Sequence, residues 1–521
     1  MKPWANDDTP GCAVAVVQKG EVVHAKGYGM ADLEHRIAIA PDSVFDIGSI
    51  SKQFTAAAVL LAAADATLSL DDDVRAHVPS LPILGSTPTT LRQLIHHTGG
   101  LRDHRVLLLL AGHHLDDVTT VRDGIDVLSR QRGRVFQPGT AHEYSNTGYF
   151  LLAQAVEHAT QQSFAAYLDA RIFEPLGMTR TRVLDNADEI VAGRAIGYSP
   201  RNGGWQIDMW RWHRTGPGAV MTTVLDLAKW DANFYDAKVG GQTFLDSMHT
   251  RGTLEDGTEL DYAAGLFHSS YRGQPTVAHA GGGAGYAGQF ERFPSLHTTI
   301  AILCNAAGSR PDLLAHRIAD VVLEEHLHAE PVADAVPATI QLTMTELDAW
   351  VATYRDVETG ELVAIERTGD ALELRIGGEH YVLDPTNDRT FLLRDQWFIA
   401  HLDGTPPHRS LVLRSPMGAE RFVEAELHRP IARELAALAG RYRSDEIGTE
   451  WRLSVDGGQL VVTGAAFDGP GALVPAARDE FTIMALEVGV VIRFRRGVRG
   501  RITGFVLRSG SMQGILFERV R

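Results

Sequence analysis

A serine and a lysine stand three positions apart at the start of a segment that favours helix. Ser49 and Lys52 precede the Ala/Leu-rich run 54–61. Because residues at i and i+3 share one face of a helix, the hydroxyl and the amine can meet. Burial lowers the pKa of a lysine so that it can accept a proton, and a helix N-terminus favours the charge of an alkoxide. The pair predicts nucleophilic catalysis by Ser49 with Lys52 as its activating partner, although this spacing also arises by chance.

A phenol and an amide stand two positions apart further along the chain. Tyr144 and Asn146 come directly before a helical pattern at 149–158. A phenol beside a lysine can relay protons, and an amide can hold that lysine and a substrate carbonyl at once. We therefore expect both side chains to join Lys52 in the site. The alternative is a helix cap formed by Ser145 or Asn146, with a buried tyrosine beside it.

A run of glycines follows His279 at the end of a predicted strand. Small residues let a substrate backbone lie against a strand edge, where backbone N–H groups can face an oxyanion. We expect the N–H groups of Ser49 and Gly282 to form an oxyanion hole and Gly281 to bind the substrate backbone. His279 would supply a positive or hydrogen-bonding group. The chain has 22 histidines, so a structural role for His279 is the alternative.

Strand patterns occur at both ends of the first 330 residues, with helical patterns between them. We expect strands at 12–17, 22–29, 276–279, 288–292 and 298–305, and helices at 54–61, 89–97, 149–158, 164–173, 226–234 and 311–327. This order predicts an α/β fold in which one antiparallel sheet is flanked by helices. Cys12 and Cys304 lie on two of the strands, and we expect buried, reduced thiols because no spaced cysteine framework is present.

The last third of the chain has short alternating strands and repeats itself. A Pro/Ala-rich linker is predicted at 328–338, and the segment 346–355 is similar to the segment 434–443. A repeat built of many short strands favours small antiparallel barrels, which close on themselves and leave no exposed edge. We predict a catalytic domain at 1–329 and two lipocalin-like barrels at 340–428 and 431–521.

Composition excludes several classes of partner. The 49 Lys and Arg against 65 Asp and Glu give a formal net charge of −16, which disfavours nucleic acid and anionic membranes. We expect no cofactor and no metal, because no paired Cys/His spacing is present. The N-terminal residues lack an apolar leader and no apolar run would span a bilayer, so we expect a cytoplasmic protein. Our hypothesis for the assembly is a homodimer.

The order S-x-x-K, Y-x-N, H-x-G resembles that of the serine β-lactamase and penicillin-binding-protein superfamily. Similar pieces at 94–101, 172–178 and 218–227 support the resemblance, and we interpret them as structural, His97 included. The third motif is His-Ala-Gly rather than Lys-Thr-Gly, which is similar to the esterase and aminopeptidase branches. A catalytic domain followed by two barrels resembles the bacterial D-stereospecific aminopeptidases.

The resemblance implies a hydrolase that works through an acyl-enzyme on Ser49. The expected substrates are small peptides or amides with an N-terminal D-amino acid. A carboxylesterase for small acyl esters is the alternative from the same chemistry. The second alternative is a penicillin-binding DD-peptidase-like protein or a weakly active regulatory binding protein. In the aminopeptidases a loop of the last barrel reaches the active site and selects free amines. The candidate here is Ala465–Phe481, which carries Asp468, Asp479 and Glu480.

Overall fold

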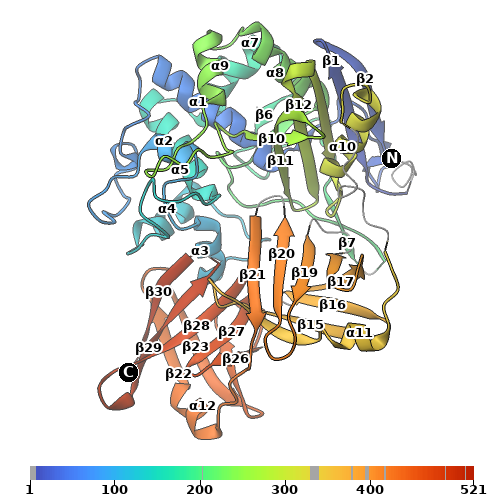
Figure 1. The fold of residues 1–521 in the computed structure, drawn as a ribbon. Helices are drawn as coiled ribbons and strands as arrows, with labels where there is room; N and C mark the ends of the chain where they lie inside the picture. The colour runs from blue at the N-terminus through green and yellow to red at the C-terminus, as the bar shows by residue number, and fades with distance from the viewer. Residues whose placement is uncertain are drawn as a thin grey trace. The chain divides into compact units, whose positions relative to one another are not determined.

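The computed structural model describes residues 8–201, 203–328, 339–376, 379–393, 398–415, 418–486, 488–510 and 512–520. These residues form two compact units (Figure 1). The first contains the described residues of Met1–Asp103, Leu115–Ile125 and Phe136–Ala329, and the second those of His104–His114, Asp126–Val135 and Glu330–Arg521. The predicted linker at 328–338 lies outside the described residues apart from His328, and the three predicted domain boundaries stay predictions.

An antiparallel sheet forms the centre of the first unit, in the order β10-β11-β12-β13-β1-β2. Its strands are β1 (Cys12–Gln18), β2 (Glu21–Tyr28), β10 (Phe267–Tyr271), β11 (Gln274–Gly283), β12 (Tyr286–Phe293) and β13 (Thr298–Cys304). The N-terminal hairpin therefore completes a sheet begun by the last strands of the unit. β10 pairs only with Gln274–Ala278. Among the described residues, the end of β11 from His279 to Gly283 thus has a strand partner on one side only, β12.

Helices cover both faces of this sheet, which confirms the predicted fold class (Figure 1). The helices of the first unit, with one that runs on into the second, are α1 (Lys52–Ala64), α2 (Leu91–Ile95), α4 (Val121–Ser129), α5 (Asn146–Thr160), α6 (Phe164–Leu168), α7 (Glu174–Leu176), α8 (Val224–Asp236), α9 (Gly241–His249) and α10 (Pro311–Val322). Phe293 of β12 packs with Ala315 of α10, whereas the preceding Arg292 pairs with Asp231 of α8. Because neighbouring strand residues point to opposite faces, α8 and α10 lie on opposite sides of the sheet.

Short strands complete the first unit. They are β3 (Met30–Asp32), β4 (Ile37–Ala38), β5 (Phe45–Asp46), β6 (Arg182–Val183), β7 (Tyr198–Arg201), β8 (Gly204–Ile207) and β9 (Val220–Thr222). β5, β9 and β6 form a small sheet next to the start of α1. Among the described residues, no helix has both the length and the apolar character that a bilayer crossing requires.

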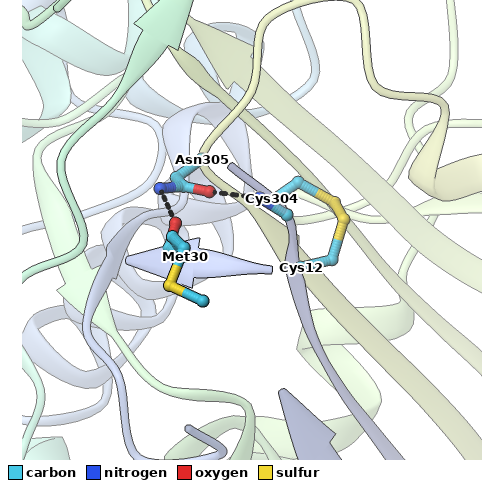
Figure 2. The surroundings of a disulfide bond; sticks show 5 residues. Cys12, Met30, Cys304 and Asn305 are labelled. Atoms are coloured by element: carbon cyan, nitrogen blue, oxygen red, sulfur yellow. Dashed lines mark hydrogen bonds between the residues drawn. A yellow bond between two sulfur atoms is a disulfide. The ribbon is translucent and has the colours of Figure 1, made fainter. Parts of the chain in front are cut away.

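Cys12 and Cys304 are joined by a disulfide, so the prediction of two reduced thiols is wrong (Figure 2). They are direct partners in the β1–β13 register and are fully buried. Asn305, the next residue, accepts a hydrogen bond from the N–H of Gly11 at 2.8 Å and donates to the carbonyl of Met30 at 3.0 Å. The two cysteines are 292 positions apart, and only the finished sheet makes them neighbours.

Removing this disulfide should destabilise the protein. Closing so long a loop restricts the unfolded chain, and such bonds are typically worth about 2–4 kcal/mol. We expect the Cys12→Ala/Cys304→Ala variant to have a free energy of unfolding lower than that of the wild type by this amount, as measured by urea titration. The reduced wild type should match the variant. A denatured but unreduced protein that reacts with maleimide at two thiols would show that the bond is absent and contradict the expectation.

The second unit contains two β structures, each preceded by a short helix. α11 (Met344–Asp348) leads into a closed antiparallel barrel in which β14 also pairs with β21. Its strands are β14 (Ala352–Asp356), β15 (Leu362–Thr368), β16 (Ala371–Ile376), β17 (Glu379–Pro385), β18 (Thr390–Leu393), β19 (Ile399–Asp403), β20 (Ser410–Ser415) and β21 (Gly418–Glu424). Its apolar side chains fill the barrel interior. This confirms the first predicted barrel.

The second β structure is a nine-stranded antiparallel sheet in the described residues. It follows α12 (Ala432–Leu438) and consists of β22 (Gly440–Ser444), β23 (Thr449–Asp456), β24 (Gln459–Thr463), β25 (Gly471–Ala472), β26 (Val474–Ala477), β27 (Glu480–Ala485), β28 (Val488–Arg496), β29 (Ile502–Ser509) and β30 (Met512–Arg519). The repeat is visible in one contact. Tyr354 donates to the carbonyl of Trp350, and Tyr442 donates in the same way to that of Leu438.

Two segments from the first part of the chain pack with this nine-stranded sheet. One contains α3 (His104–Ala111), and the other follows α4. The side chain of Gln131 donates to the carbonyl of Glu446, and the N–H of Arg132 donates to the carboxylate of the same glutamate. Gly112 lies so close to Ala465 that a Cβ at the glycine would meet the alanine Cβ at 2.3 Å. The sequence pattern gave no indication of this arrangement.

Candidate active site

Ser49 lies on a 3-10 turn, Gly48–Ser51, that leads directly into α1. The turn is held by Asp46, whose carboxylate accepts the N–H of Gly48 at 2.9 Å. Gly48 has a φ of +50°, and a Cβ there would lie 2.5 Å from the N atom of Gly282. A residue with a side chain would therefore clash with the backbone of β11. This glycine lets the nucleophile turn lie directly against the end of that strand.

The hydroxyl of Ser49 and the amine of Lys52 meet as the spacing predicts. Lys52 Nζ lies 2.9 Å from Ser49 Oγ, and the lysine side chain is fully buried. Lys52 Nζ also donates to Asn146 Oδ1 at 3.1 Å and to the carbonyl of Pro217 at 3.0 Å. These two acceptors hold the amine beside the hydroxyl of Ser49. A neutral amine in this place can accept the Ser49 proton through its lone pair, and an ammonium can return it.

The N-terminus of α5 presents Asn146 to Lys52. Ser145 is the N-cap, and its hydroxyl accepts the N–H of Thr147 at 3.3 Å. The N–H of Asn146 donates to the carboxylate of Asp103 at 2.8 Å, which leaves its amide side chain pointing to the lysine. The helix cap and the contact with Lys52, which the sequence analysis gave as alternatives for this segment, are both present, on neighbouring residues. Ser145 caps the helix, and Asn146 contacts Lys52.

Tyr144 lies against the lysine through its ring. Lys52 Nζ is 4.7 Å from the centroid of the Tyr144 ring and 5.6 Å from that of Tyr149. The second tyrosine is held apart from the chemistry, because its hydroxyl donates to the carbonyl of Ile95 at 2.8 Å. Tyr144 is therefore next to Lys52, and its expected role as a proton relay stays a prediction.

His279 is a neutral hydrogen-bonding group. Its side chain is buried, and burial together with the charge of Lys52 lowers the pKa of His279 to about 3. Its Nδ1 lies 2.6 Å from the carbonyl of Ala280, so Nδ1 carries the proton. Its Nε2 then accepts from the hydroxyl of Tyr262 at 3.2 Å. Of the two roles expected for His279, the positive group is wrong at neutral pH and the hydrogen-bonding group agrees with the geometry.

The glycines after His279 pack where no side chain would fit. A Cβ at Gly281 would lie 2.0 Å from the carbonyl oxygen of Ile47, and one at Gly283 would lie 2.4 Å from the ring of Trp210. Gly282 lies against Gly48, next to the nucleophile. The structure thus brings Gly281, Gly282 and the turn that carries Ser49 together at the end of β11, and the oxyanion hole formed by Ser49 and Gly282 stays a prediction.

A buried ion pair that the sequence analysis missed anchors the loop over Lys52. Arg214 Nη2 lies 2.5 Å from the Asp46 carboxylate, and both side chains are less than a tenth exposed. The loop that follows supplies the Pro217 carbonyl to Lys52, and its Gly216 carbonyl accepts the hydroxyl of Thr55 at 2.7 Å. Neither carbonyl has a signature in residue type, which is why the pattern of the sequence did not predict this contact.

A pocket of about 490 Å³ lies in the same unit, within the size range of small-molecule sites. Its lining includes Trp210, Trp212, Phe164, Asp185 and Arg214. Two of these are tied to the site, since Trp210 contacts Gly283 and Arg214 pairs with Asp46. The pocket therefore lies beside the strand end that carries the glycines.

One group of side chains among the described residues has spacing that suits a metal ion. Asp32, Glu34 and His35 place one ligand atom each within 4.8 Å of one another. They belong to a surface turn in which Asp32 accepts the N–H groups of the other two at 2.9 Å. None of the candidate catalytic residues is among them.

The acids of the barrel loop have partners within the second unit. Asp479 pairs with Arg496, and Glu480 pairs with Arg355 of the first barrel at 2.5 Å. These two carboxylates are therefore engaged in ion pairs within the second unit, and a contact of a loop carboxylate with a substrate amine stays a prediction. Asp468 is exposed and lies 3.4 Å from His114. That the loop reaches the catalytic cleft stays a prediction.

Comparison with known proteins agrees with this geometry. The family described as "Beta-lactamase" matches residues 2–323, so the chain belongs to the beta-lactamase family and is a serine hydrolase. It is 26% identical over 533 residues to a D-aminopeptidase of Brucella anthropi, covering 98% of this chain and 96% of the relative. It is 24% identical over 523 residues to a D-aminopeptidase of Brucella ovis, with the same coverage.

Solved structures share the fold. The octameric penicillin-binding protein homologue from Pyrococcus abyssi is 23% identical, with a TM-score of 0.58, and the match covers 81% of this chain and 98% of that one. The D-amino acid amidase from Ochrobactrum anthropi SV3, in its complex with L-phenylalanine, is 24% identical with a TM-score of 0.50, covering 60% and 93%. At these identities the likeness concerns the fold alone.

Proposed function

We propose that the enzyme hydrolyses small amides and short peptides whose N-terminal residue is a D-amino acid. The observation that carries the proposal is the contact of Ser49 with Lys52, held in place by Asn146 and the Pro217 carbonyl. The choice of substrate is supported by the D-aminopeptidase relatives, which match nearly the whole chain, barrels included.

In the proposed mechanism Ser49 Oγ attacks the substrate carbonyl carbon while its one proton passes to the Lys52–Tyr144 pair. The N–H groups of Ser49 and Gly282 hold the oxyanion of the tetrahedral intermediate. When the C–N bond breaks, the leaving amine takes the proton back from the Lys52–Tyr144 pair, and an ester remains on Ser49. Water then attacks this ester and gives one proton to the same pair. The pair returns that proton to Ser49 Oγ as the ester C–O bond breaks, which releases the acid and restores the hydroxyl.

The substrate would lie along the open end of β11. Gly281 would offer its backbone groups to the substrate. The Oδ1 of Asn146 accepts from Lys52, so its Nδ2 could donate to a substrate carbonyl. The adjacent pocket, whose lining mixes Trp210 and Phe164 with charged residues such as Asp185, is the candidate place for the substrate side chain. Because His279 is neutral, the site lacks the fixed cation that a lysine at this position would supply to a substrate carboxylate.

A substrate screen tests the proposal. We expect D-alanyl and D-phenylalanyl nitroanilides to be cleaved with a kcat/KM at least about tenfold above that of their L-isomers. This ratio corresponds to a difference of about 1.4 kcal/mol in transition-state binding between the two isomers. N-acetylation of the D-alanyl anilide should remove most of this activity. Faster turnover of nitrophenyl acetate with no anilide cleavage would favour the carboxylesterase alternative. Absence of all turnover with intact labelling of Ser49 would favour the binding protein.

Compartment and assembly stay predictions with simple measurements. A cytoplasmic chain would meet a reducing pool, whereas the Cys12–Cys304 bond favours an oxidising environment. Thiols trapped with a mass-shifting maleimide in freshly lysed cells distinguish the two, since a reduced chain gains two labels and an oxidised chain none. Light scattering on the purified protein tests the homodimer.

A further inference from the structure

His97 supports Tyr144 from behind. It follows α2 and is buried. Its carbonyl accepts the N–H of Glu143 at 3.0 Å, and its Nδ1 accepts the N–H of Ser145 at 3.2 Å. One residue therefore binds the backbone on both sides of Tyr144. Its ring also packs against the Tyr144 ring, with centroids 4.3 Å apart and planes inclined by 40°.

These contacts define which form of the imidazole is present. Because Ser145 donates an N–H, Nδ1 must offer a lone pair, so the proton of the neutral ring is on Nε2. Among the described residues, Nε2 has no hydrogen-bond partner. Burial, the charge of Lys52, and the nearby His142, His279 and His96 all hold the pKa of His97 well below its usual value.

The same ring is packed by further aromatic side chains. The rings of Tyr149 and Tyr262 lie 5.1 and 4.6 Å from it, centroid to centroid. Tyr262 in turn donates to His279, so His97 is locked between the elements that hold Tyr144 and the strand that holds the glycines. This packing holds the His97 ring in one position. Through its hydrogen bonds to the residues on both sides, His97 in turn holds the backbone of Tyr144 in place.

We propose that His97 is a positioning residue, which sets the Tyr144 phenol against Lys52 through its Nδ1 acceptor, its carbonyl and its ring. The inference rests on the proposed function, because it assigns His97 a role in the proton transfer of that mechanism. It replaces the structural interpretation that the sequence alone suggested. Proton transfer is sensitive to geometry, and a displacement of about 1 Å can cost about 10²-fold in rate.

Two polar substitutions separate positioning from packing. In His97→Asn the amide oxygen takes the place of Nδ1 and can accept from Ser145 N–H. In His97→Gln the amide lies one bond further out, near the place of Nε2. His97 has a φ of +57°, and Gln161 adopts a φ of +58° elsewhere in the chain, so glutamine is compatible with this backbone. Asparagine is among the residues that adopt it most readily.

We expect His97→Gln to lower kcat by about 10²-fold with KM nearly unchanged, and His97→Asn to recover at least about tenfold of that loss. The same order should hold for the rate of Ser49 labelling by a fluorophosphonate, which requires the activated hydroxyl but no particular substrate. His96→Asn is the matched control. The ring nitrogens of His96 face the carbonyls of Arg92 and Thr250 and not Tyr144, so both rates should stay unchanged.

Each rate is divided by the concentration of folded protein, and the folded fraction is measured by circular dichroism and thermal unfolding. Equal kcat and labelling rates in the wild type and His97→Gln, or no difference between the Asn and Gln variants, would overturn the inference and return His97 to a packing role. The wild type tests the proposed function separately. If it labels at Ser49 but cleaves no D-aminoacyl anilide, the substrate assignment fails while the ratio of labelling rates still decides the role of His97.

Discussion

Ser49→Ala is expected to lower kcat by at least about 10⁴-fold, because loss of an activated nucleophile removes the covalent pathway entirely. The fold should survive. The hydroxyl contacts Lys52, and the turn itself is held by backbone contacts and by Asp46. Measurement of D-aminoacyl anilide hydrolysis together with urea unfolding would separate the two effects.

Ser51→Ala is the matched control for this change. Ser51 lies two positions further on and is buried, with its hydroxyl accepting the N–H of Val220 at 3.2 Å. Its loss leaves a buried donor without a partner, which costs about 1–3 kcal/mol of stability. The activity of each folded molecule should change little. The assignment of Ser49 would be wrong if Ser51→Ala lost covalent labelling and Ser49→Ala kept it.

Lys52 and Tyr144 should act as one unit. We expect Lys52→Met and Tyr144→Phe each to lower kcat by about 10³-fold. The kcat of the double variant should lie within about tenfold of that of the less active single variant. The reason is that both groups move the same proton, with Lys52 Nζ 4.7 Å from the Tyr144 ring. Once one is removed, the other has lost most of its function.

Tyr149→Phe is the control for this cycle. Its ring is also near Lys52, at 5.6 Å, but its hydroxyl is bonded to the carbonyl of Ile95. We expect a loss of about 1 kcal/mol in stability and a kcat within a few-fold of the wild type. Strict additivity of the Lys52 and Tyr144 losses would show that the two residues act in separate steps.

The parts of the site that sequence could predict are those set by local spacing. Ser49 and Lys52 meet because they are one helical turn apart, and Asn146 reaches the lysine because it starts the next packed helix. The sheet followed from strand patterns at both ends of the first unit, and the barrels followed from their repeat. In each case the signal lies within a few neighbouring residues, where periodicity reports which face is buried.

The parts that sequence could not predict depend on distant partners or on backbone atoms. The Cys12–Cys304 bond needs the completed sheet, and the Pro217 carbonyl that holds Lys52 could belong to any residue type. Tyr262, which donates to His279, lies in a loop without regular periodicity.

Burial is the other quantity that residue type does not reveal. His279 was open to a charged or a neutral role from its position alone. Its neutrality follows from desolvation by the packed structure around it and from the charge of Lys52. His97 shows the same limit, since a histidine in a supporting motif gives no sign that its ring nitrogen and its carbonyl bind both neighbours of Tyr144.

Trapping the acyl-enzyme tests the central claim most directly. The enzyme is mixed with a slowly hydrolysed D-phenylalanyl ester, quenched in acid within the first turnover, digested and analysed by mass spectrometry. We expect one D-phenylalanyl adduct per chain, on the peptide that contains Ser49. The adduct should accumulate as product forms and be absent from Ser49→Ala. Product formation with no adduct, or an adduct on Ser51 or any other residue, would contradict this expectation.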